Sequence, residues 1–158
     1  MGGERETLAG TAIVRRGQAV LLRGRSGCGK SDLALRCLAQ PLRLPGEDAA
    51  YCFDLISDDQ CAGRRDTETG RVLLTAPPAI AGLLEVRGLG VVQIDALARA
   101  PLALVADLQS ADIPRMADLD AQRTNVLGVP VPLIQLMPFE VSAPAKLAIV
   151  LRDLAGTY

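Results

Sequence analysis

Two short apolar runs, residues 11–14 and 19–22, stand close together near the start of the chain. The polar segment between them, residues 15–17, ends in Gly17. Runs of four residues bounded by turn residues favour strands, and glycine readily adopts the positive φ of a tight turn. The pattern therefore predicts a β-hairpin.

Strand signals continue through the middle of the chain. Further apolar runs predict strands at residues 53–57, 71–75, 83–87, 90–94 and 102–108. The last of these runs is continuously apolar, as expected of a strand buried on both faces. Between the runs we expect a surface loop at residues 41–50 and an exposed charged hairpin tip at residues 64–70. Residues 114–122 are polar, and we expect an irregular segment or a short helix there.

Two segments carry helix signals. The first, residues 32–39, is stopped by Pro41, which cannot continue a helix. The second begins with Ser142, a residue type that caps helices, and Pro144, which fits a first turn. Its apolar residues recur on one helical face, and they are Leu147, Val150, Leu151 and Leu154. No repeat or linker divides the chain, so we expect one domain over residues 1–158.

Composition narrows the chemistry. The chain of 158 residues is 49% hydrophobic and contains no histidine. A Ser-His-Asp triad, a Cys-His pair, a zinc site with histidine ligands and a histidine phosphocarrier are therefore excluded. Any general base must be a carboxylate, and any metal ion must be held by oxygen or thiolate ligands.

Charge and cysteine usage limit the partners. The net charge is −1 and no basic run exceeds two residues, which disfavours a nucleic-acid partner. The longest uncharged stretch, residues 124–139, is too short and too rich in proline to span a bilayer. The cysteines follow no metal-ligand spacing, and the N-terminus does not have the pattern of a signal peptide. We expect a soluble cytoplasmic protein with reduced thiols and no membrane partner.

A glycine-rich segment fits the phosphate-binding pattern G-x-x-x-x-G-K-[ST] between an apolar strand and a helix. Its backbone N–H groups and the helix N-terminus are suited to phosphate oxygens, and Lys30 would reach the β- and γ-phosphates. Ser31 would bind Mg²⁺. Cys28 is interpreted as a small filler, with redox sensing as the alternative. The predicted nucleotide-binding residues are Gly24, Arg25, Ser26, Gly27, Cys28, Gly29, Lys30 and Ser31.

Acidic residues at strand ends are candidates for holding a metal ion or accepting a proton. The adjacent pair Asp58-Asp59 is one candidate, and Asp95 and Asp107 are others. Successive side chains of a strand point to opposite faces, so one member of the pair can face a phosphate while the other turns away. A solvated acidic turn is the alternative interpretation of this pair.

A second glycine cluster follows Glu85 and Arg87, which stand two residues apart and share one face of a predicted strand. Near a phosphate site, this carboxylate could hold Mg²⁺ and this guanidinium could stabilise charge during transfer. A hairpin with an incidental salt bridge explains the same pattern.

Three motifs in this order resemble the HPr kinase/phosphorylase family: GRSGCGKS at 24–31, LISDDQ at 55–60 and LLEVRGLGVVQID at 83–95. Residues 131–155 resemble the short alphaproteobacterial-type members, which lack the N-terminal domain of longer enzymes. The resemblance implies an α/β fold, namely a single P-loop-containing kinase domain of the HPr kinase/phosphoenolpyruvate carboxykinase-like type with a mixed sheet and flanking helices.

The resemblance also implies a function. The implied function is an ATP- and Mg²⁺-dependent protein serine kinase that acts on HPr, the phosphocarrier of the sugar phosphotransferase system. Lys30 matches the family's phosphate-loop lysine, Ser31 and Glu85 match its magnesium positions, and Asp59 matches the catalytic aspartate. Asp58 and Arg87 complete the implied catalytic set. Longer members are hexamers, so a homo-oligomer is implied as well.

Two departures from the family bear on a phosphorylase activity. Ala9 stands where the family has a histidine, and residues 143–146 lack the arginine of the family's C-terminal glycine-arginine element. Both argue against dephosphorylation of the substrate. Arg115 and Arg123 are candidates for a further active-site arginine. A P-loop small-molecule kinase and a non-catalytic nucleotide-sensing module are the alternatives.

Overall fold

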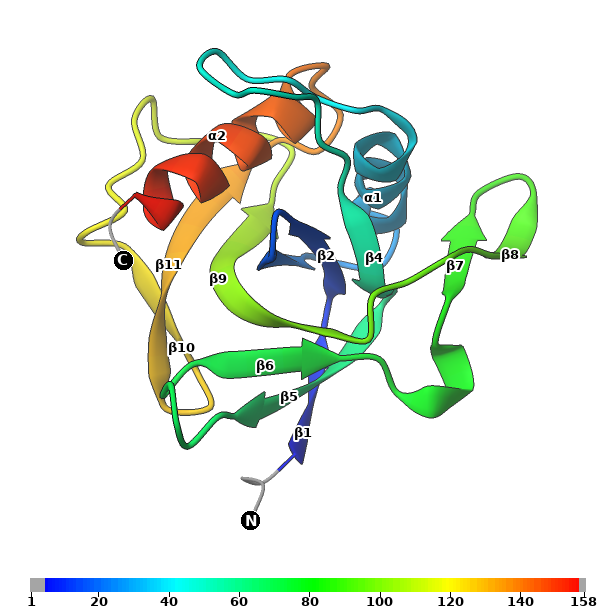
Figure 1. Cartoon of the computed structure of the whole chain (residues 1–158). Coiled ribbons are helices and arrows are strands. Elements are labelled where there is room, and N and C mark those ends of the chain that lie inside the picture. The colour runs from blue at the N-terminus through cyan, green and yellow to red at the C-terminus, as the bar shows by residue number, and fades with distance from the viewer. Residues whose placement is uncertain (1–4, 157–158) are drawn as a thin grey trace.

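The computed structural model describes residues 5–156, which form a curved mixed β-sheet, two α-helices and a separate β-hairpin (Figure 1). No helix in this part of the chain has the length and apolarity needed to cross a bilayer. In chain order the elements are β1 (Arg5–Ala9), β2 (Thr11–Arg15), β3 (Gln18–Arg23), α1 (Lys30–Ala39), β4 (Asp54–Ser57), β5 (Gln60–Arg65), β6 (Val72–Thr75), the 3₁₀ turn η1 (Pro78–Ile80), β7 (Leu83–Val86), β8 (Gly90–Gln93), β9 (Arg99–Leu108), β10 (Arg123–Val126), β11 (Val129–Leu136) and α2 (Ala143–Ala155).

Strand β9 is the long central strand of the sheet and pairs with three others, β3, β11 and β6. Its C-terminal half runs parallel to β3 on one side and to β11 on the other. Its first residues pair with β6, which continues the sheet through β5 to β1. The carboxyl ends of β3, β9 and β11 therefore share one edge, where ligand sites of open α/β sheets form.

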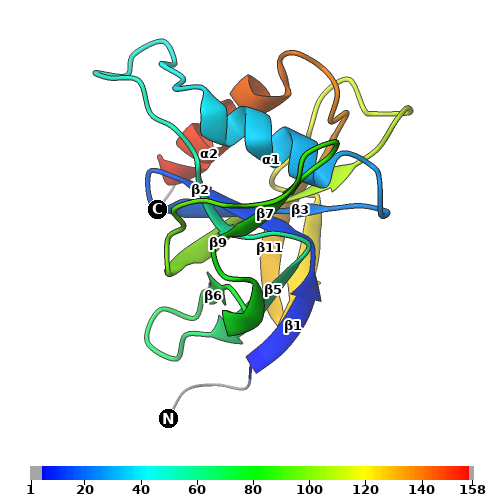
Figure 2. The ribbon, with the colours of Figure 1, turned by 90° about the vertical axis from the view of Figure 1, so that its right-hand side faces the viewer.

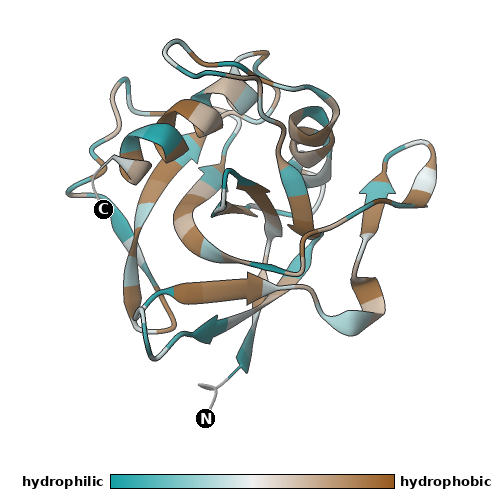
Figure 3. Cartoon of the chain, in the orientation of Figure 1, coloured by the Kyte–Doolittle hydropathy of each residue, from teal (hydrophilic) through white to brown (hydrophobic). Residues whose placement is uncertain are grey.

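Each face of the sheet carries its own hydrophobic cluster. One cluster packs strand residues such as Ile13 and Val20 against both helices. The other cluster contains the strand residues that point to the opposite face, such as Ala12 and Val14. They pack against residues of β5, β6, β10 and β11. Both helices thus cover the same face, as Figure 2 shows, and the central strands are mainly hydrophobic (Figure 3).

The α/β class with a mixed sheet is confirmed, and so are most of the local predictions. The first hairpin turns at Arg16 and Gly17, both with positive φ, as a two-residue hairpin turn requires. Both helices form, and α1 ends before Pro41. The strand pair β7–β8 forms too, but it makes a sheet of its own outside the main one.

Four strands were not predicted, namely β1, β5, β10 and β11. Strands β1, β5 and β10 are short and contain few apolar residues, so the hydrophobic pattern does not mark them. Strand β1 pairs with β5, which is distant in sequence, whereas β10 pairs with the adjacent β11. Pro130 and Pro132 obscured β11, because proline weakens a strand pattern. The expected side-chain cap by Ser142 is also wrong: the side chain makes no capping bond and the backbone is helical there, with φ −80° and ψ −2°.

The loop at 41–50 is anchored by a buried ion pair. Arg15, at the end of β2, donates to both carboxylate oxygens of Glu47, at 2.9 and 2.7 Å, and to the Leu42 carbonyl oxygen. The Leu44 N–H also donates to Glu47. Both charged side chains are almost fully buried. The hydrogen bonds from Arg15 are the main reason that the pKa of Glu47 falls from 4.5 to about 2.

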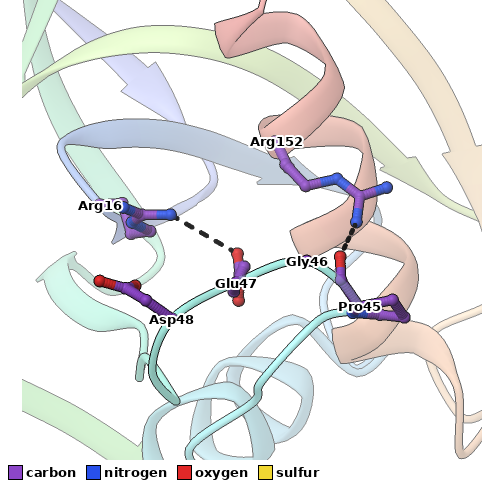
Figure 4. Close-up of a pocket in the computed structure, with 6 residues that line it drawn as sticks. All are labelled: Arg16, Pro45, Gly46, Glu47, Asp48 and Arg152. Carbon is purple, nitrogen blue, oxygen red and sulfur yellow. Dashed lines mark hydrogen bonds and ion pairs between the residues drawn. The ribbon is translucent and has the colours of Figure 1, made fainter.

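A surface hollow of about 510 Å³ lies over this anchor, and its lining is shown in Figure 4. Arg16 approaches Glu47 at 3.7 Å and stacks on the Tyr51 ring. On the opposite side, Arg152 of α2 donates to the Pro45 carbonyl oxygen at 3.2 Å. These groups already pair with one another, so the hollow is a place where the loop is fastened to β2 and α2.

The variant Glu47→Gln tests the anchor. Because the folded-state pKa is depressed, ionised Glu47 contributes stability above pH 4.5 and loses it as the pH falls toward 2. At pH 7 the variant leaves Arg15 without its charged partner, and we expect the free energy of unfolding to fall by about 3 kcal/mol. Chemical denaturation at several pH values should show this deficit shrinking below pH 4.5. The exposed Glu68→Gln is the matched control, and equal effects of the two variants at pH 7 would contradict the assignment.

Candidate active site

A cleft of about 360 Å³ opens where β3 leads into α1, between the glycine-rich loop and the β7–β8 hairpin. Its walls come from four segments: the glycine-rich loop with the start of α1, the end of β4, the β7–β8 hairpin and the loop after β11. The lining residues are Ser26, Gly27, Gly29, Lys30, Ser31, Asp32, Leu35, Asp59, Glu85, Val86, Arg87 and Phe139.

The glycine-rich loop presents the start of α1 to this cleft. Gly27 and Gly29 have φ values of 79° and 108°, which side chains with a Cβ rarely adopt. No side chain caps α1, so the first N–H groups of the helix have no partner from a capping residue. The N-terminus of a helix carries partial positive charge, and this end is therefore suited to an anion.

Contacts within the glycine-rich loop fix its shape. Lys30 reaches back across the loop, and its Nζ donates to the carbonyl oxygens of Gly24 and Arg25, at 2.7 and 3.0 Å. The Cys28 sulfur packs so closely that a Cβ on Gly24 would lie 2.5 Å from it. Gly24, Arg25 and Cys28 do not line the cleft, and the packing of Cys28 fits the interpretation of a filler.

Asp58 is buried behind the cleft and binds three separate segments. Its Oδ1 accepts hydrogen bonds from the hydroxyls of Thr11, at 2.9 Å, and Ser31, at 2.7 Å. Its Oδ2 accepts from the backbone N–H of Glu85 at 3.0 Å. One carboxylate thereby connects β2, the start of α1 and β7.

Asp59 turns the other way and lines the cleft. Its φ of 67° lies in the left-handed region, and its side chain is exposed. Its N–H donates to Thr11 Oγ1 at 3.1 Å, and its carbonyl oxygen accepts from the Gly10 N–H at 2.8 Å. The two acidic side chains thus separate as expected, one buried and one in the cleft.

Glu85 and Arg87 approach the same cleft from the hairpin, which projects from the body of the molecule (Figure 1). Both are exposed, and among the described residues no ion pair joins them. The incidental salt bridge considered for this motif is therefore not seen, and both charged groups remain directed to the cleft.

The other candidates lie elsewhere. Asp107 forms a two-bond ion pair with Arg23, at 2.7 and 3.0 Å, across neighbouring strands. Asp95, Arg115 and Arg123 are exposed and do not line the cleft. Ala9 pairs with Gln60 and precedes the glycine whose N–H binds Asp59.

Two residues of the site have no motif to mark them. Thr11 reads as an ordinary strand residue, yet it contacts both aspartates. Phe139 is an exposed ring at the rim of the cleft, directed at Gly29. Arg36 of α1 holds its loop by donating to the carbonyl oxygens of Pro138 and Glu140. The scarcity of aromatic residues in this chain is the one signal that could have singled out Phe139.

The thiols of Cys37 and Cys61 are buried and do not line the cleft. Burial raises the pKa of Cys37 and of Cys61 to about 12, so both stay protonated at neutral pH. Within residues 5–156 no three cysteine or carboxylate side chains converge as a ready-made metal cage. The charged groups of the cleft are one lysine, one arginine and the carboxylates of Asp32, Asp59 and Glu85.

Comparison with known proteins places this cleft in context. No family model matches the chain. It is 31% identical to the HPr kinase/phosphorylase of Cupriavidus metallidurans and 31% identical to that of Burkholderia lata, in each case over 94% of this chain and 44% of the relative. The chain thus spans less than half the length of these relatives.

A solved structure, that of the Hpr(Ser) kinase/phosphatase from Coxiella burnetii, shares the fold. The TM-score is 0.71 at 19% identity, and the match covers 94% of this chain and 89% of that one. The resemblance inferred from the three motifs is confirmed: nearly the whole chain is similar to part of these HPr kinase/phosphorylases, and the solved structure has the same fold.

Proposed function

We propose that this domain transfers the γ-phosphoryl group of ATP to a serine of the phosphocarrier HPr. One observation carries the proposal: the exposed carboxylate of Asp59 lies in the same cleft as Lys30 and Ser31 of the glycine-rich loop. A phosphate-binding loop alone would bind a nucleotide, whereas a carboxylate beside it can accept the proton of an attacking hydroxyl. The names of the homologues support HPr as the substrate.

The loop and the start of α1 would hold the nucleotide. The β- and γ-phosphates fit the uncapped helix N-terminus, where Gly27 and Gly29 leave the backbone accessible. Lys30 would exchange its bonds to the loop carbonyl groups for bonds to phosphate oxygens. Cys28, Gly24 and Arg25 would support the shape of the loop without touching the phosphates.

Ser31 and Glu85 fit a magnesium site. Because Ser31 gives its proton to Asp58, its oxygen lone pairs are free to face the cleft. Glu85 adds an exposed carboxylate, and Mg²⁺ characteristically takes one or two protein oxygens together with phosphate oxygens and water. When bound, the ion would supply charge neutralisation on the β- and γ-phosphates.

Asp59 would act as the base. The serine oxygen forms a bond to the γ-phosphorus while the bond from that phosphorus to the β,γ-bridging oxygen breaks, and ADP leaves with the bond's electron pair. The hydroxyl proton passes to the Asp59 carboxylate. Arg87 would stabilise negative charge on the transferred group. We assign Asp58 a positioning role, because both of its oxygens are engaged behind the cleft.

The β7–β8 hairpin is a suitable place for a protein substrate to dock. Leu89 and Val91 are strongly exposed there, beside Arg87 on the acceptor side of the cleft. We propose that HPr contacts this hairpin and inserts its serine toward Asp59. A cytoplasmic location and a homo-oligomeric state, including a hexamer, form part of the same proposal.

A labelling assay tests the function directly. The protein is incubated with γ-labelled ATP, Mg²⁺ and purified HPr, and the label is mapped by proteolysis. We expect phosphoserine on HPr, because the cleft combines a nucleotide loop with a base for a protein hydroxyl. ATP turnover with small metabolites alone would indicate a small-molecule kinase, and binding without transfer would indicate a nucleotide sensor. Either result would overturn the proposal.

The variant Asp59→Asn tests the base. Asparagine tolerates the left-handed backbone at this position and keeps the shape of the side chain, but it does not accept the proton. We expect kcat to fall by about 100-fold or more while the Kd for ATP stays close to that of the wild type. The exposed Asp95→Asn lies outside the cleft and should keep full activity. Undiminished turnover in Asp59→Asn would show that Asp59 is not the base.

The variant Glu85→Gln tests the metal site. The change keeps the backbone bond from residue 85 to Asp58 but removes the anionic ligand. We expect the Mg²⁺ concentration for half-maximal activity to rise by about 10-fold, and chelation to abolish transfer in both proteins. Glu6→Gln on the exposed strand β1 serves as the control. An unchanged magnesium requirement would remove Glu85 from the site.

A further inference from the structure

We infer that Thr11 is a positioning residue that sets both members of the acidic pair. This inference rests on the function proposed above. The Thr11 side chain is completely buried, and its hydroxyl is the one group that contacts both Asp58 and Asp59 within the described residues. It donates to Asp58 Oδ1 and accepts from the Asp59 N–H, so a single oxygen atom links the carboxylate of Asp58 to the backbone of Asp59.

The bond to Asp59 fixes the backbone of that residue. A φ of 67° is uncommon for a residue with a Cβ and persists only where neighbours hold it. Thr11 Oγ1 holds the N–H of Asp59, and the N–H of Gly10 holds its carbonyl oxygen. These two contacts come from consecutive residues at the start of β2, and they direct the Asp59 side chain into the cleft.

The bond to Asp58 supports the other side of the site. Thr11 and Ser31 share the Oδ1 atom, and the two bonds measure 2.9 and 2.7 Å. With Thr11 present, Oδ1 keeps a donor even when Ser31 shifts toward the cleft. Asp58 therefore stays in place while Ser31 adjusts to a ligand, and through Oδ2 it keeps hold of the Glu85 backbone.

The chemistry requires a hydroxyl at this position, and shape alone is not enough. Valine has the shape of threonine, but it would leave the Asp59 N–H without its acceptor and Asp58 Oδ1 with one donor fewer. Unmet hydrogen bonds at buried groups are costly, so the acidic pair would shift to find other partners. Displacing a catalytic group by about 1 Å can cost about 100-fold in rate.

The experiment compares Thr11→Val with Thr11→Ser, which restores the hydroxyl. In the HPr labelling assay we expect Thr11→Val to lower kcat by about 10- to 100-fold with the KM for ATP nearly unchanged, because the Thr11 hydroxyl bonds to the acidic pair and not directly to the loop. Thr11→Ser should recover most of the loss. Thr7→Val, the same change at an exposed position of β1, is the matched control and should behave as wild type.

A second measurement does not depend on activity. Amide hydrogen exchange at Asp59, followed by NMR, should become faster in Thr11→Val and remain slow in Thr11→Ser, because only the latter keeps the acceptor. If Thr11→Val does not fold, Thr11→Ala replaces it as the hydroxyl-free variant. Failure of both to fold would show a purely structural residue and overturn the inference.

The outcomes separate this inference from the proposed function. If the wild-type protein labels no HPr, the proposed function fails, while the exchange data still test the contact. If the wild type labels HPr and Thr11→Val retains full kcat, the positioning role fails and the function stands. A rise in the KM for ATP at constant kcat would likewise overturn the positioning role.

Discussion

The candidate site depends on the hydrogen bonds of one buried carboxylate, that of Asp58. A buried charge is tolerated only when donors satisfy it, and here the donors come from β2, the start of α1 and β7. Two of these segments, the start of α1 and β7, carry residues that line the cleft. The carboxylate therefore fixes the spacing between the glycine-rich loop and the β7–β8 hairpin, which has no strand partner in the main sheet.

The same arrangement gives the two aspartates different surroundings. Asp58 does not line the cleft, because its carboxylate accepts hydrogen bonds from Ser31 and from the backbone N–H of Glu85. Asp59 lies exposed in the cleft beside these residues. This difference needs a reversal of the chain between the two residues. The left-handed φ of Asp59 supplies it, and the contacts from Gly10 and Thr11 maintain it. The position of Asp59 in the cleft thus depends on a backbone conformation that the start of β2 maintains.

The surroundings of the site are positioned by strand pairing and by one buried ion pair. Parallel strands β3, β9 and β11 end at one edge, so the loops that follow β3 and β11 meet there and bring Phe139 against Gly29. On the opposite end of α1, the Arg15–Glu47 pair fastens a long loop whose composition gave no hint of an anchor. Each contact joins groups more than 30 residues apart, beyond the range of any local pattern.

The sequence by itself determined the local features: the first hairpin, both helices, the glycine-rich loop, the acidic pair and the Glu85–Arg87 motif. Each rests on turn chemistry, apolar spacing or a contiguous motif. Only the tertiary structure decided which aspartate enters the cleft, that Asp107 is paired with Arg23, and that Thr11 binds both acids. Those outcomes depend on long-range pairing and on burial, because a side chain's partners are set by the strands that fold against it.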